Sequence, residues 1–243
     1  AAAIADVAST PLTLIEVQRL ALEDQPSLRG EAATIRALRE QSVAAAQLPD
    51  PRLIAGVMQI PATGDERLSF AEVEERSARM ARGLLAIGVG KGSHVALLAP
   101  NGPAWVVAWL AASRIGAVVA MLNTYSKARE LGWLLRHSDA AVLLTVDSHL
   151  GHDYLAGLEE AAPGLADATA GRIAVESHPY LRSVWTWGEG ERPWAGRIDD
   201  LVARGDEVPD GLLAAVEEQV TPADPMVVVY SSGSTADPKG AIH

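Results

Sequence analysis

The sequence predicts an α/β protein whose largely parallel sheet is flanked by helices. Between residues 94 and 146, short apolar runs alternate with helical patterns, and the segment lengths suit strands joined by right-handed helical crossovers. Residues 226–230, MVVVY, form a further short run that is rich in β-branched side chains and bounded by turn signals. Such a run is typical of a strand buried on both faces of a parallel sheet.

The chain divides into two predicted parts. Residues 1–60 form a helical lead-in, because they are rich in alanine with alternating charges and because apolar residues recur at helical spacing over residues 14–21. A break around Pro51 ends this part. Residues 61–243 form the α/β domain.

A capping box from Ser69 to Glu72 marks the first helix of the domain, which ends before the sequence GVGKG at residues 88–92. These glycines suggest a dinucleotide-binding fingerprint. They follow a helix and precede a strand at residues 94–99, however, whereas the fingerprint requires a strand, then the glycines, then a helix. We therefore interpret the glycines as turn residues.

The second helix opens at Pro103, which suits a first helical turn. The helix is apolar almost all round and contains Trp105 and Trp109, so we expect it to be buried. Residues 104–122 form an apolar run with the length of a membrane span. A serine, an arginine and a glycine interrupt this run, which favours a helix followed by a strand at residues 117–122.

Periodicity and turn signals predict the remaining elements. They are a helix at residues 126–135, a strand at residues 141–146, a short helix at residues 154–162, a strand at residues 181–187 and a short amphipathic helix at residues 212–216.

The composition excludes several classes of protein. The 243 residues include 20 Lys and Arg against 31 Asp and Glu, and the net charge of -11 opposes nucleic-acid binding and offers no polybasic surface to a membrane. The absence of cysteine excludes disulfides and thiolate metal sites and suits a reducing cytoplasm. Residues 1–10 lack the basic start of a signal peptide. We expect a cytoplasmic protein without a transmembrane segment.

A loop rich in hydroxyls and glycine follows the MVVVY run. Small side chains at residues 231–235 allow backbone N–H groups and hydroxyls to surround an anion, and Lys239 adds a positive charge, so phosphate is the expected ligand. Gly233 and Lys239 have the spacing of a Walker A loop. Because Pro238 replaces its second glycine and Gly240 replaces its Mg²⁺-binding hydroxyl, a P-loop ATPase ranks last among the alternatives.

The segment from Tyr230 to Thr235, followed by the Pro-Lys-Gly at residues 238–240, resembles the signature loop of the adenylate-forming superfamily of acyl-CoA synthetases, luciferases and peptide-synthetase adenylation domains. Ala236 stands where that family usually has glycine, and its Cβ would stiffen the loop. Softer motifs from Ser69 onward are similar to the start of acyl-CoA synthetases. The resemblance implies that residues 61–243 are the N-terminal part of the AMP-binding large domain, incomplete and ending just after the phosphate-binding loop, with the C-terminal domain absent.

The resemblance also implies an AMP-forming acid–thiol ligase, in which a small-molecule carboxylic acid and ATP give an acyl-adenylate and pyrophosphate before CoA displaces AMP. The full-length enzyme would use ATP, Mg²⁺ and CoA. The residues expected to bind the ATP phosphates are Ser231, Ser232, Gly233, Ser234, Thr235, Lys239 and Gly240. We assign no catalytic residue, metal ligand or tightly bound cofactor within this chain. Because the remaining parts of the family's site lie downstream, we predict that the 243 residues alone are inactive.

A non-catalytic nucleotide-binding or scaffold fragment is the main alternative, which would bind ATP without turnover. His149 and His152 could share a metal, but we interpret them as surface or capping histidines. Asp199 and Asp200 could be paired catalytic carboxylates, although a solvated helix start is the preferred interpretation. An unpaired sheet edge at the end of the chain would allow homo-oligomers to form.

Overall fold

The computed structural model describes residues 67–209, 211–231 and 238–243. All of them belong to one unit of the chain, Gln59–His243. The helical lead-in expected at residues 1–60 lies outside the described residues, and the division into a lead-in and a domain stays a prediction.

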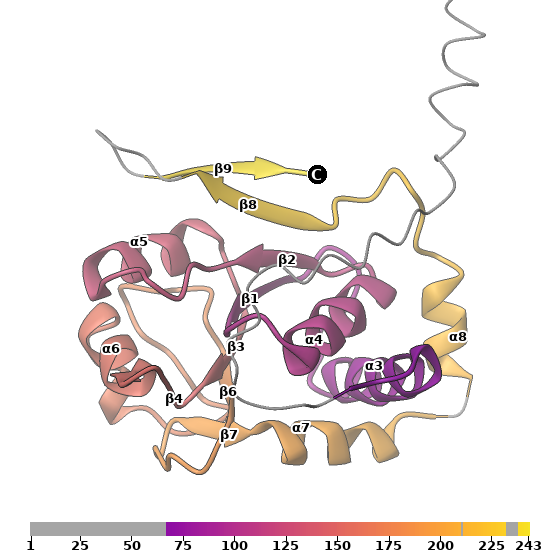
Figure 1. Cartoon of the computed structure of the whole chain (residues 1–243), viewed down its shortest axis with the longest axis horizontal. Helices are drawn as coiled ribbons and strands as arrows, with labels where there is room; N and C mark the ends of the chain where they lie inside the picture. Colours follow the sequence, from indigo (N-terminus) through magenta and orange to yellow (C-terminus); the bar gives the residue numbers. More distant parts are fainter. Residues whose placement is uncertain (1–66, 210, 232–237) are drawn as a thin grey trace, which may run out of the picture. The chain divides into compact units, whose positions relative to one another are not determined.

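A sheet of seven strands is the centre of the described residues (Figure 1). Its strand order is β7-β6-β3-β1-β2-β8-β9, and every neighbouring pair is parallel except β8 and β9. The strands are β1 (His94–Leu98), β2 (Val118–Met121), β3 (Val142–Val146), β6 (Ser183–Trp187), β7 (Ala195–Arg197), β8 (Val227–Ser231) and β9 (Lys239–Ile242). A separate small hairpin consists of β4 (Ser148–His149) and β5 (His152–Asp153).

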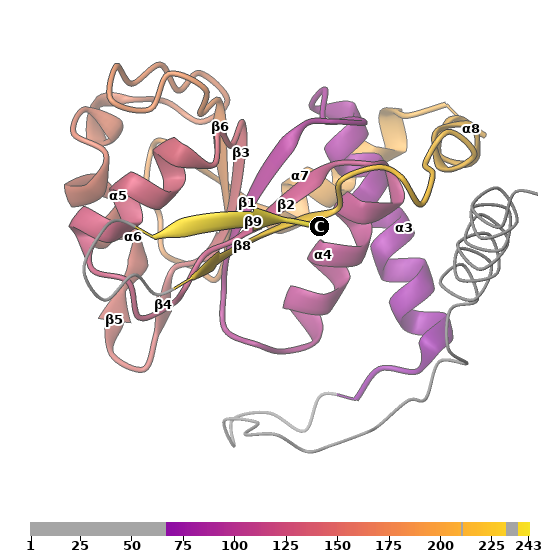
Figure 2. The same ribbon diagram turned by 90° about the horizontal axis from the view of Figure 1, so that it is seen from above.

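Helices cover both faces of this sheet, which confirms the predicted α/β class. Figures 1 and 2 show α3, α4 and α7 against one face and α5 and α6 against the other. The helices are α3 (Phe70–Ala86), α4 (Pro103–Arg114), α5 (Ala128–His137), α6 (Tyr154–Ala161), α7 (Ile198–Arg204) and α8 (Leu212–Glu217), with short 3₁₀ turns η1 (Leu165–Asp167) and η2 (Gly205–Glu207).

Strand β1 shows how the sequence builds two cores. Val95 and Leu97 belong to the core beneath α3 and α4, whereas Ala96 and Leu98 belong to the core beneath α5 and α6. Successive side chains point to opposite faces of a strand, and here both faces are covered. The sequence of this strand is therefore one apolar run and does not alternate between apolar and polar residues.

The strands β2-β1-β3-β6-β7 form a doubly wound arrangement. The chain runs from β1 to β2, crosses back over β1 to β3, and then continues outward to β6 and β7. Right-handed crossovers that run in opposite directions place their helices on opposite faces, as α4 and α5 lie here. In such sheets, ligands bind outside the carboxyl ends of the strands, near the point where the winding reverses.

The start of α3 confirms the predicted capping box. The Ser69 hydroxyl accepts a hydrogen bond from the Glu72 backbone N–H at 3.3 Å, and the Glu72 carboxylate accepts one from the Ser69 N–H at 2.7 Å. These contacts with Ser69 lower the pKa of Glu72. After the helix, Gly88 and Gly92 have φ angles of 84° and 78°, in the left-handed region that favours glycine. The interpretation of the GVGKG segment as a turn is confirmed.

The prediction that the second helix is buried all round is wrong. Its buried residues are Val107, Ala108, Ala111 and Ala112. Val106 is 38% exposed, and Trp105 and Trp109 are only partly buried. Helix α4 packs on α3, β1 and β2, so its side chains are covered on the side that faces these elements and remain accessible on the other.

The apolar run at residues 104–122 is divided between α4 and β2, as predicted. Within the part of the chain that the structure describes, no helix combines the length and the apolar composition needed to cross a membrane.

Candidate phosphate-binding site

The predicted phosphate-binding loop lies between β8 and β9. Ser231 is the last residue of β8 and Lys239 is the first residue of β9, and the two residues are directly paired in the antiparallel ladder. The Ser231 hydroxyl donates a hydrogen bond to the Lys239 carbonyl at 3.4 Å. Of the seven predicted residues, Ser232, Gly233, Ser234 and Thr235 lie outside the described residues, so the structure gives only the base of this loop.

The direction of β8 places this loop at an edge of the sheet suited to ligands. Strand β8 runs parallel to β2, which runs parallel to β1. The carboxyl end of β8 therefore lies at the same edge as the carboxyl ends of the other parallel strands, where open α/β sheets bind ligands. Ser231 and Lys239 are both exposed there, so a hydroxyl and an ammonium group can reach an anion from solvent.

Gly240 has a packing role that the sequence pattern did not reveal. It lies opposite Tyr230 in the hairpin. A Cβ atom on Gly240 would lie 2.9 Å from Cγ1 of Val228 and 3.2 Å from Cε1 of Tyr230, both closer than a relaxed contact. A larger residue would therefore displace the Tyr230 ring.

An aromatic cluster joins the end of β8 to α5. The Tyr230 ring packs edge-on against His137 and Trp133, with centroid distances of 5.8 Å and 6.2 Å, and Trp133 stacks on His137 at 4.4 Å. The Tyr230 hydroxyl lies 3.3 Å from Nδ1 of His137. Burial raises the pKa of Tyr230 to about 12, which keeps the phenol neutral. The cluster fixes the strand from which the loop departs.

A lysine from the GVGKG turn holds the segment that leads into β8. Lys91 Nζ forms a 2.8 Å salt bridge with the Asp224 carboxylate and donates a 2.7 Å hydrogen bond to the Gln219 carbonyl. The contact with Lys91 and the Thr221 backbone N–H lower the pKa of Asp224. Turn residues far upstream thus help to set the position of the loop strand.

The histidine pair lies on a surface hairpin that leads directly into α6, whose N-cap is Asp153. His149 on β4 and His152 on β5 are directly paired across the hairpin, and neither is buried. In the described ranges, no group of three or more His, Cys, Asp or Glu side chains could hold a metal ion. Asp199 and Asp200 lie exposed in the first turn of α7, as expected of a solvated helix start.

Trp105 and Trp109 pack on each other in α4, with their ring centroids 6.0 Å apart. Both rings are partly buried against the core beneath α3 and α4. Trp133 and His137, which contact Tyr230, were not identified from the sequence. Nothing in the sequence around the helix predicted at residues 126–135 distinguishes these two residues from surface positions, because their role depends on a strand far along the chain.

Comparison with known proteins agrees with the resemblance of residues 230–240 to the signature loop of the adenylate-forming superfamily. Residues 42–243 match the family model described as AMP-binding enzyme. The "Putative acyl-CoA synthetase YngI" of Bacillus subtilis is 34% identical over 179 residues, which cover 72% of this chain and 32% of that protein. The mitochondrial medium-chain acyl-CoA ligase ACSF2 of Mus musculus is 30% identical over 176 residues, or 72% of this chain and 28% of that protein.

A solved structure shows a similar fold. The crystal structure of the anthranilate CoA ligase AuaEII in complex with anthranoyl-AMP aligns with a TM-score of 0.58 and 27% identity, covering 74% of this chain and 30% of that one. The chain spans about a third of the length of the curated relatives it matches. Because the family model covers most of the chain, this chain belongs to the adenylate-forming AMP-binding enzymes and corresponds to an N-terminal portion of its acyl-CoA synthetase relatives.

Proposed function

We propose that the protein to which this chain belongs is an ATP-dependent acyl-CoA synthetase. A small-molecule carboxylate would attack ATP to give an acyl-adenylate and pyrophosphate, and CoA would then displace AMP to form the thioester. The observation that carries this proposal is the signature loop, which departs from the ligand-binding edge of the sheet in a chain that matches the AMP-binding family. The acyl chain is left open, since the relatives differ in their named substrates.

The loop and its base would bind the phosphates of ATP. Ser231, Ser232, Gly233, Ser234, Thr235, Lys239 and Gly240 are the proposed phosphate-binding residues. Hydroxyls, backbone N–H groups and the exposed Lys239 ammonium would offset negative charge on the departing pyrophosphate. The packing of Tyr230 over Gly240 would keep the two strands at the base of the loop in register.

Mg²⁺ would neutralise part of the phosphate charge when ATP is bound. Among the described residues there is no cluster of acidic or histidine side chains for a metal ion. Mg²⁺ is commonly held by one or two carboxylates together with substrate phosphates instead of a protein cage. The ammonium group of Lys239 and the hydroxyl of Ser231 would supply contacts from the protein to the phosphates. A cytoplasmic location and a possible homo-oligomer belong to the same proposal.

Substitution of the loop lysine tests the proposal. Lys239→Ala in the whole protein is expected to lower carboxylate-dependent ATP–pyrophosphate exchange by about 10²-fold or more, the usual effect of removing one group that stabilises developing charge. Lys127→Ala removes the same charge from an exposed lysine at the start of α5 and serves as the control. Exchange that is equal in the two variants would contradict the assignment.

A polypeptide limited to residues 1–243 is expected to bind ATP without catalysing the exchange, because it spans only a third of the length of the relatives. This outcome corresponds to the second candidate function, a nucleotide-binding or scaffold fragment. The measurement is ATP titration together with pyrophosphate exchange on a preparation whose intact mass is confirmed. Carboxylate-dependent exchange at that mass would overturn the prediction of inactivity.

A further inference from the structure

The connection between β1 and α4 contains an asparagine followed by a glycine, Asn101 and Gly102. The side-chain amide of an asparagine can be attacked by the backbone nitrogen of the next residue, and glycine hinders this attack least because it has no Cβ. Asn101 is exposed to solvent. Among the residues that the structure describes, neither the Asn101 side chain nor the Gly102 N–H has a hydrogen-bond partner. No existing contact therefore holds the two reacting groups apart.

The backbone at Gly102 leaves the attacking nitrogen outside the regular hydrogen bonds of α4. Gly102 is the N-cap residue of this helix and has an extended conformation, with φ of 174° and ψ of -179°. Its carbonyl accepts a hydrogen bond from the Val106 N–H at 3.1 Å, which is the first bond of the helix. The Gly102 nitrogen can therefore react without the loss of a helical hydrogen bond.

Asn123 is the only other asparagine in the 243 residues, and its surroundings are different. It is also exposed, so exposure does not distinguish the two residues. Its Oδ1 accepts a hydrogen bond from the Tyr125 N–H at 3.0 Å. The next residue is Thr124, whose β-branched side chain hinders attack by its backbone nitrogen. The structure thus provides a reactive asparagine and an internal reference.

We propose that Asn101 is a site of spontaneous deamidation. The Gly102 nitrogen forms a bond to Cγ of Asn101, the bond from Cγ to Nδ2 breaks, and ammonia leaves with the proton that the Gly102 nitrogen loses. The product is a cyclic succinimide. Water then adds to one of its two carbonyl carbons and opens the ring, which gives either aspartate or isoaspartate. The reaction consumes water and requires neither an oxidant nor a reductant.

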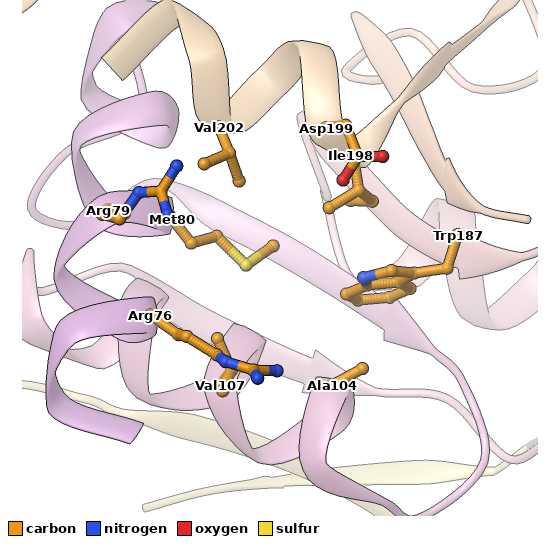
Figure 3. Close-up of a pocket in the computed structure, with 9 residues that line it drawn as sticks. All are labelled: Arg76, Arg79, Met80, Ala104, Val107, Trp187, Ile198, Asp199 and Val202. Carbon is orange, nitrogen blue, oxygen red and sulfur yellow. The ribbon is translucent and has the colours of Figure 1, made fainter. Parts of the chain in front are cut away.

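Both products change the start of α4 beside a pocket. This pocket of about 320 Å³ is lined by Ala104 in the first turn of α4, together with Arg79 of α3 and Trp187 of β6 (Figure 3). Each product adds a negative charge. The first turn of α4 has no acidic residue, and a carboxylate near a helix N-terminus is favourable. Isoaspartate also lengthens the main chain by one carbon just before Gly102, so it displaces the start of the helix.

Peptide mapping of the whole protein tests the proposal. After incubation in mildly alkaline buffer, trypsin releases residues 92–114 and 115–127 as separate peptides, each with one asparagine. The first peptide is expected to gain the mass of the acid form at least about tenfold faster than the second, because Asn123 has a hindered neighbour and a hydrogen bond to break. Two isomers of equal mass identify aspartate and isoaspartate.

Three variants assign the reaction to this pair of residues. Gly102→Ala is sterically permitted, since a Cβ there has nothing within 4 Å, and is expected to slow deamidation by at least about tenfold. Asn101→Gln is expected to abolish it, because the longer side chain would have to form a less accessible six-membered ring. Gly90→Ala makes the same change at another glycine with open space around it and should react like the wild type.

Three results would overturn the proposal. They are equal rates for the two peptides, formation of aspartate without isoaspartate, and a wild-type rate in a Gly102→Ala variant whose circular dichroism shows that it is folded. The last two results would point to direct hydrolysis of the amide instead of attack by the Gly102 nitrogen. None of these measurements involves ATP or pyrophosphate exchange, so failure of this proposal and failure of the proposed function can be told apart.

Discussion

His178 is a buried histidine whose hydrogen bonds define its protonation state. It is 4% exposed, its Nε2–H donates to the Gly132 carbonyl at 2.9 Å, and the Ser177 hydroxyl lies 2.9 Å from Nδ1. Burial lowers the pKa of His178 below its ordinary value of 6.5, with the nearby Arg136 charge acting in the same direction. The folded protein therefore holds this ring neutral.

This lowered pKa makes stability depend on pH in a defined direction. Below about pH 6.5, the unfolded chain takes up a proton that the folded chain excludes, so the stabilisation is complete above that pH and is lost as the pH falls. We expect the free energy of unfolding to decrease by up to about 1.4 kcal/mol per pH unit between roughly pH 6.5 and 5.5.

Urea unfolding of the wild type and of His178→Gln at both pH values checks this prediction. Gln can still donate to the Gly132 carbonyl but does not titrate, so its decrease in stability over this window should be smaller. An equal decrease in the two proteins would assign the pH dependence to other groups.

At the scale of the element, the packing of the β8–β9 hairpin depends on Gly240, which has no side chain. The Tyr230 ring and Val228 occupy the space next to the Gly240 Cα. Gly240→Val is therefore expected to destabilise the hairpin by about 1–3 kcal/mol through overpacking. Faster amide hydrogen exchange in β8 and β9 would report this local change.

Ala241→Val is the matched control for this substitution. Ala241 is the next residue of β9, is exposed and pairs with Val229, so a β-branched side chain can be accepted there. If Ala241→Val accelerated exchange as much as Gly240→Val, the effect would not come from the contact with Tyr230. If the hairpin positions the phosphate-binding loop, Gly240→Val and Ala241→Val should also differ in their affinity for ATP.

At the scale of the whole molecule, one glycine on each side of the sheet permits close helix packing. A Cβ on Gly83 of α3 would lie within 2.3 Å of the Leu201 carbonyl oxygen in α7, and a Cβ on Gly132 of α5 would lie 2.6 Å from the Ala161 carbonyl oxygen in α6. Both contacts are with backbone, which cannot move aside as a flexible side chain can. The two helix layers therefore depend on these two positions.

Substitution of helical glycines by alanine separates two effects on the free energy of unfolding, the steric cost of close packing and the gain in helix propensity. Gly83→Ala and Gly132→Ala are each expected to lower the free energy of unfolding by about 1–3 kcal/mol or more. Gly157→Ala in α6 has nothing within 4 Å of its new Cβ and should instead stabilise the protein by about 0.5–1 kcal/mol. Urea unfolding measures all three, and stabilisation by Gly83→Ala would contradict the close contact.

The elements were predicted where their signals are local. The capping box at Ser69, the turn at Gly88 and the separation of residues 104–122 into α4 and β2 all depend on patterns within a few residues. The burial of α4 was predicted wrongly, because an apolar composition does not say which side of a helix has a neighbour. The small hairpin of His149 and His152 was missed, since its strands are only two residues long.

The sequence by itself determined the α/β class, most of the elements and the signature loop that places the chain in its family. These properties arise from periodicity and from contiguous residues. Only the tertiary structure decided the strand order, the contact of Tyr230 with His137, 93 residues apart, and the meeting of Arg79 with Trp187 around one pocket. The physical reason is that these features depend on how distant segments pack, and the pattern of any single segment is compatible with several partners.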